Sequence, residues 1–529
     1  MRPKGRGELD SLYFNYPHFD PPEASLVQNN VAPVVIVGAG PVGMTTALSL
    51  AKQGVSSILL ERKTTFNDGS RAICISRSSF QTFERLGAIA PFLKKALPWT
   101  RGRSFYRGRQ ILEFEMPDSG DEKYRPMYNL QQQYIEQFLY HAVAECPLVD
   151  VRWQSEVTAL QDHPTSVEVM VKDPLRSYRL WADYVIAADG ARSAVRSMRG
   201  LRLNGDNHAG RYVIADVQMP HDYPTIRRAL FDPASRPGGT VLIHRQADDI
   251  WRIDYQLRDD EDAETAMEEA NIRSNVRAVL ADIGYDGDWE LEWWSVYSAN
   301  TLALDDYRDG RVFFAGDSAH IVPIFGVRGL NNGIADGENI GWKLAMVING
   351  KAGPGLLDSY SPERRGATLD VFEQASKSTR FMTPPTTGFG LMRDAALSLA
   401  LSQEWAGQLA NPRQMTPYRY DCAPWTQVDG KTDRLAPGNV LPDCRIGNGF
   451  LSDQLAAEFT LVHCAMPRLA ALSNLRQIAV PEIQGVAAQS CLVRPDGYIL
   501  GRWTTPDPAV IRKTLAKALD LAGKEETPR

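Results

Sequence analysis

A glycine-rich turn near the start of the chain carries the clearest chemical signal. Gly38, Gly40 and Gly43 follow the apolar run 34–37 and open the helix-forming run 44–53. In this spacing the first glycine allows a tight turn, the second lets the backbone approach a pyrophosphate, and the third lets the helix pack on the strand. The positive end of that helix would face the phosphates. The pattern predicts a dinucleotide site, and it does not by itself choose between NAD and FAD.

Charged side chains follow the next predicted strand. Residues 58–60 are apolar, and Glu61 ends the run 18 residues after Gly43, where a carboxylate would accept hydrogen bonds from a ribose diol. Arg62 comes next and is included in the predicted cofactor site. Arg71 stands where a cation could reach the cofactor phosphates, and a plain surface arginine is an equal alternative.

Two more acids end buried strands far along the chain. Asp189 and Gly190 follow the apolar run 185–188, and Asp317 follows the run 312–316. The carboxyl ends of parallel strands line the crevice where such folds bind ligands. For Asp189, taken alone, a structural role is slightly favoured, because Asp189 or Ser193 could cap the helix that follows.

Larger elements must position these residues. Ser76 can cap a helix that runs to Leu86. Residues 450–501 indicate a strand, a helix, a strand and a hairpin, with Asp496-Gly497 as the hairpin turn. A helix is expected over 329–348, with an apolar face and a glycine-rich start whose N–H groups could face a ring or an anion. Strands are expected over 212–219, 239–244, 250–257 and 289–297, with one helix over 263–283. Strands grouped without intervening helices indicate an antiparallel layer, which could roof a substrate pocket. By strand alternation, Asp254 shares a face with Arg252, and His244 lies on a neighbouring strand.

Composition excludes several function classes. The 529 residues carry a net charge of −6, which argues against nucleic acid as the main partner. No run approaches the roughly 18 apolar residues that a membrane span needs, and residues 1–30 lack the apolar core of a secretory signal. The six cysteines form no CxxC pair and no histidine cluster accompanies them. This favours a cytoplasmic protein with reduced thiols and no metal.

Three motifs are the glycine turn at Gly38, the Asp189-Gly190 turn and the Gly316-Asp317 turn. Together they resemble the FAD-dependent aromatic monooxygenases of the phenol hydroxylase and p-hydroxybenzoate hydroxylase type, over about residues 33–375. Residues 493–497 are similar to the thioredoxin-like domain of the phenol hydroxylase branch. The resemblance implies an α/β fold with a Rossmann-like FAD-binding domain. Its expected parts are an N-terminal arm over 1–32, the FAD-binding domain over 33–209 and 301–400, an antiparallel β-sheet substrate domain over 210–300, a linker over 401–445, and a small thioredoxin-like domain over 446–529.

The resemblance also assigns roles to residues. Glu61 would hold the adenosine ribose, and Asp317 the ribityl or pyrophosphate part of FAD. Asp189 would lie between FAD and NAD(P)H. Further cofactor contacts are implied for Arg71 and Gln132, and backbone contacts to the flavin edge for Gly329, Leu330 and Asn331. The sequence departs from the family at Arg328, where a glutamine is usual. This cation could stabilise reduced flavin or bind an acidic substrate, or it could point to solvent or pair with an acid.

The implied activity is NAD(P)H- and O2-dependent hydroxylation of a phenolic compound through a flavin C4a-hydroperoxide. Candidate catalytic residues are His244, Asp254 and Arg328, although a structural role is favoured for His244 and for Asp254. The implied partners are a small aromatic substrate and dioxygen, and a homodimer is one possible assembly. The alternatives are an oxidase or other non-hydroxylating flavoenzyme, or a flavin-binding partner protein without catalysis.

Overall fold

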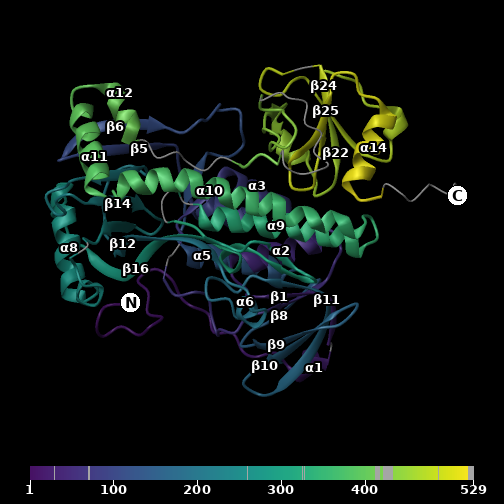
Figure 1. Cartoon of the computed structure of the whole chain (residues 1–529), viewed down its shortest axis with the longest axis horizontal. Coiled ribbons are helices and arrows are strands. Elements are labelled where there is room, and N and C mark those ends of the chain that lie inside the picture. The colour runs from purple at the N-terminus through teal and green to yellow at the C-terminus, as the bar shows by residue number, and fades with distance from the viewer. Residues whose placement is uncertain are drawn as a thin grey trace.

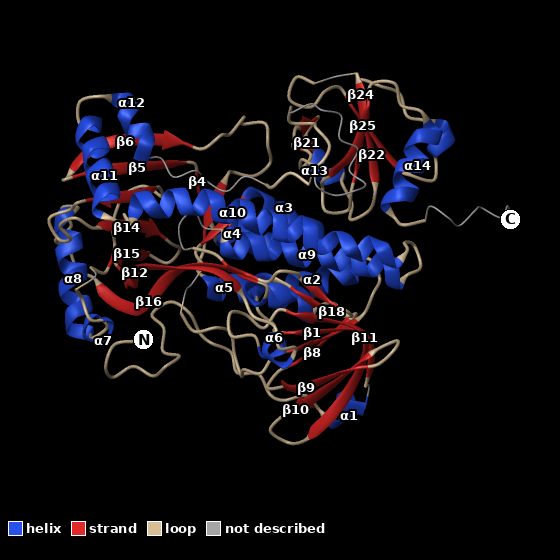
Figure 2. Ribbon diagram, viewed as in Figure 1, coloured by secondary structure: helices blue, strands red, loops and turns tan. Residues whose placement is uncertain are grey.

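The computed structural model describes residues 1–28, 30–69, 72–258, 260–323, 326, 328–410, 417–420, 433–486 and 488–521. The chain folds as two large sheets joined by helices, with a smaller α/β unit at the C-terminal end (Figure 1). Figure 2 shows the long helices α9 (Gly329–Ile348) and α10 (Tyr360–Met382) lying between the first sheet and the C-terminal unit. Among the described helices, none is both long and apolar enough to cross a membrane.

The first sheet carries the glycine turn. Its strand order is β17-β18-β11-β1-β2-β8, and β9 and β10 extend from β11. β1 pairs in parallel with β11 and β2, as expected for a buried α/β sheet. The strands are β1 (Val31–Val37), β2 (Ser57–Leu60), β8 (Val149–Arg152), β9 (Glu156–Asp162), β10 (Val167–Lys172), β11 (Ser177–Ala187), β17 (Arg308–Asp309) and β18 (Val312–Phe314).

Helices cover this sheet and connect its strands. The predicted helix over 329–348 is confirmed as α9, and Ser76 caps α3 by accepting a hydrogen bond from the Ser79 amide, as predicted. The remaining helices and short strands of this part are α1 (Ala24–Gln28), α2 (Pro41–Lys52), α3 (Arg77–Leu86), α4 (Ile89–Lys95), α5 (Gln132–Ala144), α6 (Ala194–Met198), β3 (Cys74–Ser76), β4 (Leu97–Trp99) and β7 (Met127–Asn129).

The second sheet has the order β19-β16-β12-β15-β14-β13-β5-β6. It is antiparallel apart from the parallel pair β13–β5, so it also takes in strands from outside 210–300. Its strands are β5 (Arg101–Tyr106), β6 (Arg109–Glu115), β12 (Asn204–Gln218), β13 (Arg227–Phe231), β14 (Thr240–Arg245), β15 (Ile250–Gln256), β16 (Glu290–Ala303) and β19 (His320–Ile321).

The two faces of this sheet differ. One face is apolar and packs under α8 (Glu269–Asp282), with Val213, Ile243, Ile253 and Val276 in one core. The prediction of one helix over 263–283 was wrong, because α7 (Ala263–Ala266) ends before α8 begins. The indole N–H of Trp294 donates to the Met267 carbonyl at 2.9 Å and so holds the break. The strand β13 was not predicted.

The C-terminal unit contains a four-stranded sheet in the order β23-β22-β24-β25. The predicted turn at Asp496-Gly497 is confirmed, with a hydrogen bond from the Gly497 amide to the Arg494 carbonyl. The helix expected between the first two strands is only the short 3-10 turn Ala470–Leu472. The other elements are α11 (Thr387–Ala400), α12 (Glu404–Gly407), β20 (Arg445–Ile446), β21 (Gly449–Phe450), α13 (Leu451–Gln454), β22 (Thr460–Cys464), β23 (Arg476–Val480), β24 (Gln489–Val493), β25 (Ile499–Trp503) and α14 (Pro508–Ala518). The thioredoxin likeness and the domain boundaries stay predictions.

A buried charge network attaches this unit to α9 and α10. The carboxylate of Glu363 receives both Arg494 terminal nitrogens, at 2.7 and 2.9 Å, and Lys343 Nζ at 2.8 Å. The Trp342 indole N–H donates to Asp496 at 3.0 Å. Burial lowers the pKa of Lys343 to about 8. Removal of any one partner would leave a buried charge uncompensated, so the C-terminal hairpin is an integral part of the fold.

Glycines allow α2 and α9 to pack closely. A Cβ at Gly341 would lie 2.5 Å from the Ser49 Cβ, and a Cβ at Gly337 would lie 2.9 Å from the Val42 carbonyl oxygen. These distances are shorter than any real Cβ contact, so larger residues would force the helices apart. The contact sets the distance between the two helices that flank the predicted site.

We predict that Gly341→Ala lowers the free energy of unfolding by about 1–3 kcal/mol, because the added methyl overpacks this contact. Thermal melts of the purified protein with excess FAD measure the change. Gly390→Ala in α11 is the matched control, since a Cβ there meets open space and gains roughly 0.5–1 kcal/mol of helix propensity. Equal melting temperatures for the two variants would contradict the prediction.

Candidate active site

The structure brings the turn at Gly38 into contact with the turn at Asp189-Gly190. Gly38 has a φ of +106°, and a Cβ there would lie 2.4 Å from the Ala188 carbonyl oxygen, so only glycine fits. The Ala188 amide donates to the Val37 carbonyl at 2.8 Å. Asp189 therefore follows directly from the backbone that touches the glycine turn.

The third turn lies against the first two. Ser318 Oγ donates to the Ala187 carbonyl at 2.5 Å, and a Cβ at Gly333 would lie 2.7 Å from Val42 Cγ2 and 3.2 Å from Gly316 Cα. The Gly316 amide donates to Asp336 at 2.9 Å. Three segments more than a hundred residues apart thus meet at the carboxyl ends of β1, β11 and β18, where folds of this kind have their ligand crevice.

Carboxylates line this crevice. Glu61 accepts hydrogen bonds from the Ala39 and Lys63 amides, each at 3.0 Å, so its carboxylate is fixed on the glycine turn. Asp189 Oδ2 accepts from the Val195 amide at 3.1 Å, whereas its buried Oδ1 has no hydrogen-bond partner among the described residues. Asp317 is exposed although both its neighbours are buried.

The capping alternative for this region is correct for Ser193. Its hydroxyl accepts from the Arg196 amide at 3.0 Å and begins α6. Asp189 Oδ2 likewise accepts a hydrogen bond from the Val195 amide, and Asp189 Oδ1 stays available to a ligand. The structural and functional roles of Asp189 are therefore compatible.

The structure describes two of the remaining predicted cofactor residues, Gln132 and Arg62. Gln132 accepts from the Ala72 amide at 3.1 Å and donates to Glu136 at 2.8 Å at the start of α5. Arg62 is exposed. Arg71 lies outside the described residues, so its predicted role stays a prediction.

Gly329, Leu330 and Asn331 form the first turn of α9. The residue that precedes this turn is Arg328, whose side chain has no acceptor and cannot cap the helix. The Asn331 side chain accepts from the Ser76 amide at 2.8 Å and donates to the Cys74 carbonyl at 3.1 Å. The positive end of α9 is thereby fixed beside β3.

Arg328 is buried, with 3% of its surface exposed, so the alternative that it points to solvent was wrong. Burial lowers its pKa, and the charge of Asp370 opposes that shift. Its Nε lies over Gly326, where a Cβ would be only 2.6 Å away. The arginine thus folds back into the protein at the start of α9.

The inner face of the second sheet is polar and buried. Arg252 binds Asp216 through two hydrogen bonds of 2.8 and 3.0 Å, and His244 lies opposite Arg252 on β14. The sequence prediction that Asp254 shares this face agrees with the strand register. We refer to Asp216, Arg227, His244, Arg252 and Asp254 together as the polar face.

Burial shifts the acid–base properties of this face. It raises the pKa of Asp254 to about 7, against the opposing charges of Arg252 and Arg227. It lowers the pKa of His244 to about 3, and the same two arginines add to the shift. His244 is therefore neutral near pH 7, while Asp254 exchanges its proton in that range. His244 Nδ1 and Asp254 Oδ1 have no hydrogen-bond partner among the described residues.

Arg227 is a further residue of this site, and no sequence pattern indicated it. It lies on β13 with 7% of its surface exposed, and within the described part of the chain it makes no hydrogen bond or ion pair. Burial lowers its pKa to about 10, against the charges of Cys74 and Asp254. The signal was weak, since two adjacent arginines obscure the alternation of a strand in 227–231. An unpaired buried cation is costly and suits an anionic ligand.

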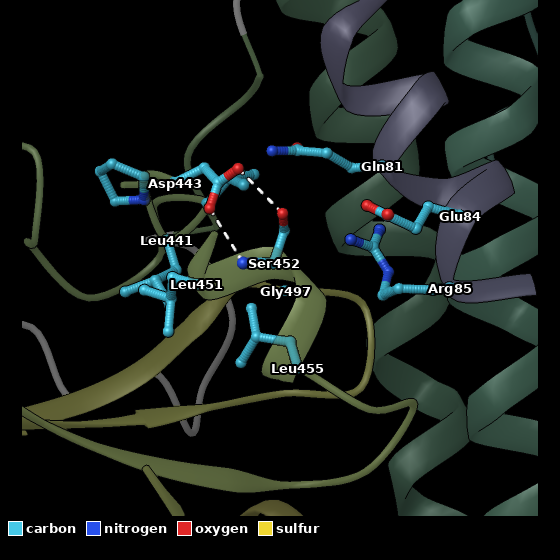
Figure 3. A pocket seen from close by; sticks show the side chains of 11 residues that line it. Gln81, Glu84, Arg85, Leu441, Asp443, Leu451, Ser452, Leu455 and Gly497 are labelled. Carbon is cyan, nitrogen blue, oxygen red and sulfur yellow. Dashed lines mark hydrogen bonds between the residues drawn. The ribbon is translucent and has the colours of Figure 1, made fainter. Parts of the chain in front are cut away.

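Two cavities adjoin α3. One has about 360 Å³ of empty space between α3 and the C-terminal unit, and Figure 3 shows Glu84 and Arg85 facing Asp443 and Ser452 across it. The second, of about 590 Å³, lies between α3, α9 and α10, and Asn331 and Asp370 are among its lining residues. Neither is lined by the glycine turns.

Comparisons with known proteins agree with this geometry. The family described as FAD binding domain matches residues 31–375. A 3-(3-hydroxy-phenyl)propionate/3-hydroxycinnamic acid hydroxylase of Mycobacterium sp. (strain JLS) is 30% identical over 68% of this chain, which spans 62% of that relative's length. The protein of the same name from Klebsiella pneumoniae (strain ATCC 700721 / MGH 78578) is 29% identical over 83% of this chain and 79% of its own.

Solved structures share the fold. The flavin-dependent monooxygenase PieE, in complex with FAD and substrate, superposes with a TM-score of 0.77 at 23% identity, covering 93% of this chain and 99% of its own. OxyS anhydrotetracycline hydroxylase from Streptomyces rimosus gives a TM-score of 0.70 at 25% identity, with the same coverage.

We predict that Asp254 makes the protein less stable as the pH rises from 5 to 7. The native state keeps a proton that the unfolded chain loses near pH 4, so this contribution to stability falls through that window and is constant above about pH 7. Asp254→Asn removes the effect. Its melting temperature relative to the parent should therefore rise from pH 5 to 7 and then level off.

The exposed Asp286→Asn is the control for this pH series and should follow the parent at every pH. A constant difference between Asp254→Asn and the parent across the series would show that Asp254 does not hold its proton.

Proposed function

The chain belongs to the FAD binding domain family, and on that premise we propose that it is a monooxygenase that hydroxylates a phenolic compound with NAD(P)H and dioxygen. One observation carries the proposal. The start of α9, at the three turns, is joined through β3 and β7 to a buried polar sheet face with unpaired acid, base and cation groups. A site that only stores FAD has no need of such a face.

The residues present fit FAD. A Cβ at Gly40 would meet no atom of the described residues within 4 Å, so the first turn of α2 is an open cradle for a pyrophosphate. Asp189 presents a buried, unpartnered oxygen, and Glu61 is oriented on the same turn. We assign the ribose to Glu61, the pyrophosphate to the start of α2, and the ribityl or pyrophosphate part to Asp317.

FAD, when bound, supplies the acceptance of hydride from NAD(P)H and the activation of dioxygen. The protein binds and orients the reactants. The positive end of α9, at Gly329 to Asn331, favours negative charge on a group placed before it. Arg328 adds a buried positive charge beside that helix start. Both would stabilise the anionic form of the flavin edge.

We assign proton transfer to Asp254. Its pKa of about 7 matches a base that takes a phenol proton near neutral pH, since a group near the working pH is both available and basic enough. His244, neutral and buried, serves as a hydrogen-bonding neighbour. The apolar cluster of Trp99, Leu112, Phe114 and Met127 beside this face would exclude water from the reacting ring.

The unpaired Arg227 further indicates that the aromatic substrate is an acid. The mycobacterial and Klebsiella relatives are named for acids of this kind. A carboxylate on the substrate would pair with Arg227 and offset the cost of its burial. A cytoplasmic location is part of the proposal, supported by the free thiols of Cys74, Cys146, Cys444 and Cys464.

The purified protein should be yellow, and a screen of phenolic acids should find one that stimulates NAD(P)H oxidation and yields a hydroxylated product. Product identified by mass spectrometry, in step with NAD(P)H consumed, measures the coupling. Consumption that yields only hydrogen peroxide with every phenol would favour an oxidase. A colourless preparation that takes up no FAD would refute the proposal.

Asp317→Ala is the site control and should lose bound FAD, and full flavin occupancy would remove Asp317 from the site.

We predict that Arg227→Gln weakens the binding of a phenolic acid by roughly 10- to 100-fold, because a charged hydrogen-bonded pair is lost. Binding of the corresponding amide should change less than threefold. Isothermal titration of the FAD-loaded protein measures both. Arg228→Gln is the matched control, since that guanidinium lies 3.1 Å from the ring centre of Tyr223 and belongs to the opposite face of the strand. Equal losses for acid and amide would refute the assignment.

A further inference from the structure

Residues 2–16 are the first part of the predicted N-terminal arm, and from here on this segment is called the arm. It precedes the family match and is nevertheless fixed to both layers of the protein. Arg2 pairs with Asp68 at 2.8 Å in the first layer and with Glu292 of β16 at 2.5 Å in the second. The Arg2 side chain is 3% exposed. In Figure 1 the N-terminus lies beside β16, where this contact is made. The arm therefore crosses the seam between the two layers.

Glu292 holds the arm in place. Its carboxylate is 1% exposed and accepts hydrogen bonds from Ser11 Oγ at 2.6 Å and the Leu12 amide at 2.9 Å, besides its ion pairs with Arg2 and Arg6. All these donors come from the arm. A buried carboxylate that lost them would be strongly destabilising, so the arm is a permanent part of the fold.

The arm passes beside the predicted cofactor contacts. The Tyr134 hydroxyl donates to the Tyr13 carbonyl at 3.1 Å, and Gln133 donates to the Tyr16 hydroxyl at 2.9 Å. Gln133 and Tyr134 directly follow Gln132 at the start of α5. Asp68, which binds Arg2, lies three residues before Arg71. The arm therefore lies beside the start of α5, where Gln132 is predicted to contact the cofactor.

Tyr13 follows the arm residue that binds β16 next to the polar face. Leu12 binds Glu292, whose neighbour Trp293 lies opposite Asp216 in the sheet. The Tyr13 ring is half-buried, lies 6.0 Å from the Tyr134 ring, and its hydroxyl makes no hydrogen bond within the described part of the chain. Burial raises its pKa, Asp216 raises it further and Arg252 opposes the shift, so the phenol stays protonated beside that ion pair.

We propose that the arm is one wall of the substrate chamber and that Tyr13 is a specificity-determining residue facing the bound aromatic ring. This inference rests on the proposed function. An aromatic side chain that the arm holds beside this part of the sheet would limit the size of the substrate ring and pack against it. The hydroxyl, which has no hydrogen-bond partner among the described residues, is available to a polar substituent. The arm would also keep water from the reduced cofactor.

Two measurements on the FAD-loaded protein test this. Tyr13→Ala should raise the acrylamide quenching constant of the bound flavin about threefold, since the wall is opened. It should also shift the ratio of dissociation constants for a phenol-based acid and its naphthol analogue about tenfold in favour of the larger ring. Tyr140→Ala, in the aromatic cluster with Phe19 and Trp153, is the matched control and should change neither.

Tyr13→Phe keeps the ring and should leave quenching unchanged, which separates wall closure from loss of folding. Should Tyr13→Ala fail to fold, Tyr13→Leu replaces it and should give intermediate values. Quenching and size preference that equal those of Tyr140→Ala would overturn the inference. Quenching does not depend on turnover, so a protein that binds FAD but hydroxylates no phenol would refute the proposed function and still decide the role of Tyr13.

Discussion

The close packing of α2 on α9 is the constraint on which the rest of the structure depends. Each helix begins at a turn of the crevice, and each offers its positive end to the same space. Gly333, Gly337 and Gly341 let α9 approach so closely that the two helix starts and the turn at Gly316 meet. A pocket for one extended cofactor follows from this contact, because neither helix alone could bind both of its ends.

The second sheet shows how one layer can serve two purposes. Its outer face is an ordinary apolar core under α8, and it supplies the stability. Its inner face keeps Arg227, His244 and Asp254 buried with incomplete pairing, which costs stability. Groups buried in this way have shifted pKa values, and such groups concentrate where chemistry is done. The apolar burial on the outer face therefore offsets the loss of stability caused by the buried polar groups on the inner face.

Sequence patterns predicted the elements that follow local rules. Ser76 at the start of α3, the helix over 329–348 and the turn at Asp496-Gly497 are each specified by residues close together in the chain. The acids at strand ends were found for the same reason, since a strand that ends in an acid is visible in a short window.

The remaining features depend on distant partners. The break between α7 and α8 is held by Trp294, which lies far along the chain from Met267. The place of Arg227 on the polar face is known only once β13 is paired with β5 and β14, and two arginines in a row make that strand hard to predict. The arm could be ordered or mobile on sequence alone, because the buried carboxylate that fixes it belongs to β16. Its role was therefore open until the layers were assembled.

The salt-bridge cluster around Glu363 has an evolutionary consequence. Arg494 lies on the C-terminal hairpin, and Glu363 and Lys343 lie on the two long helices, so these positions cannot drift one at a time. Homologues that retain this hairpin should change them jointly, for instance by substituting the whole cluster with apolar residues of similar volume. A correlated pattern across these positions would mark which relatives carry a tail docked in the same way, before any of their structures is known.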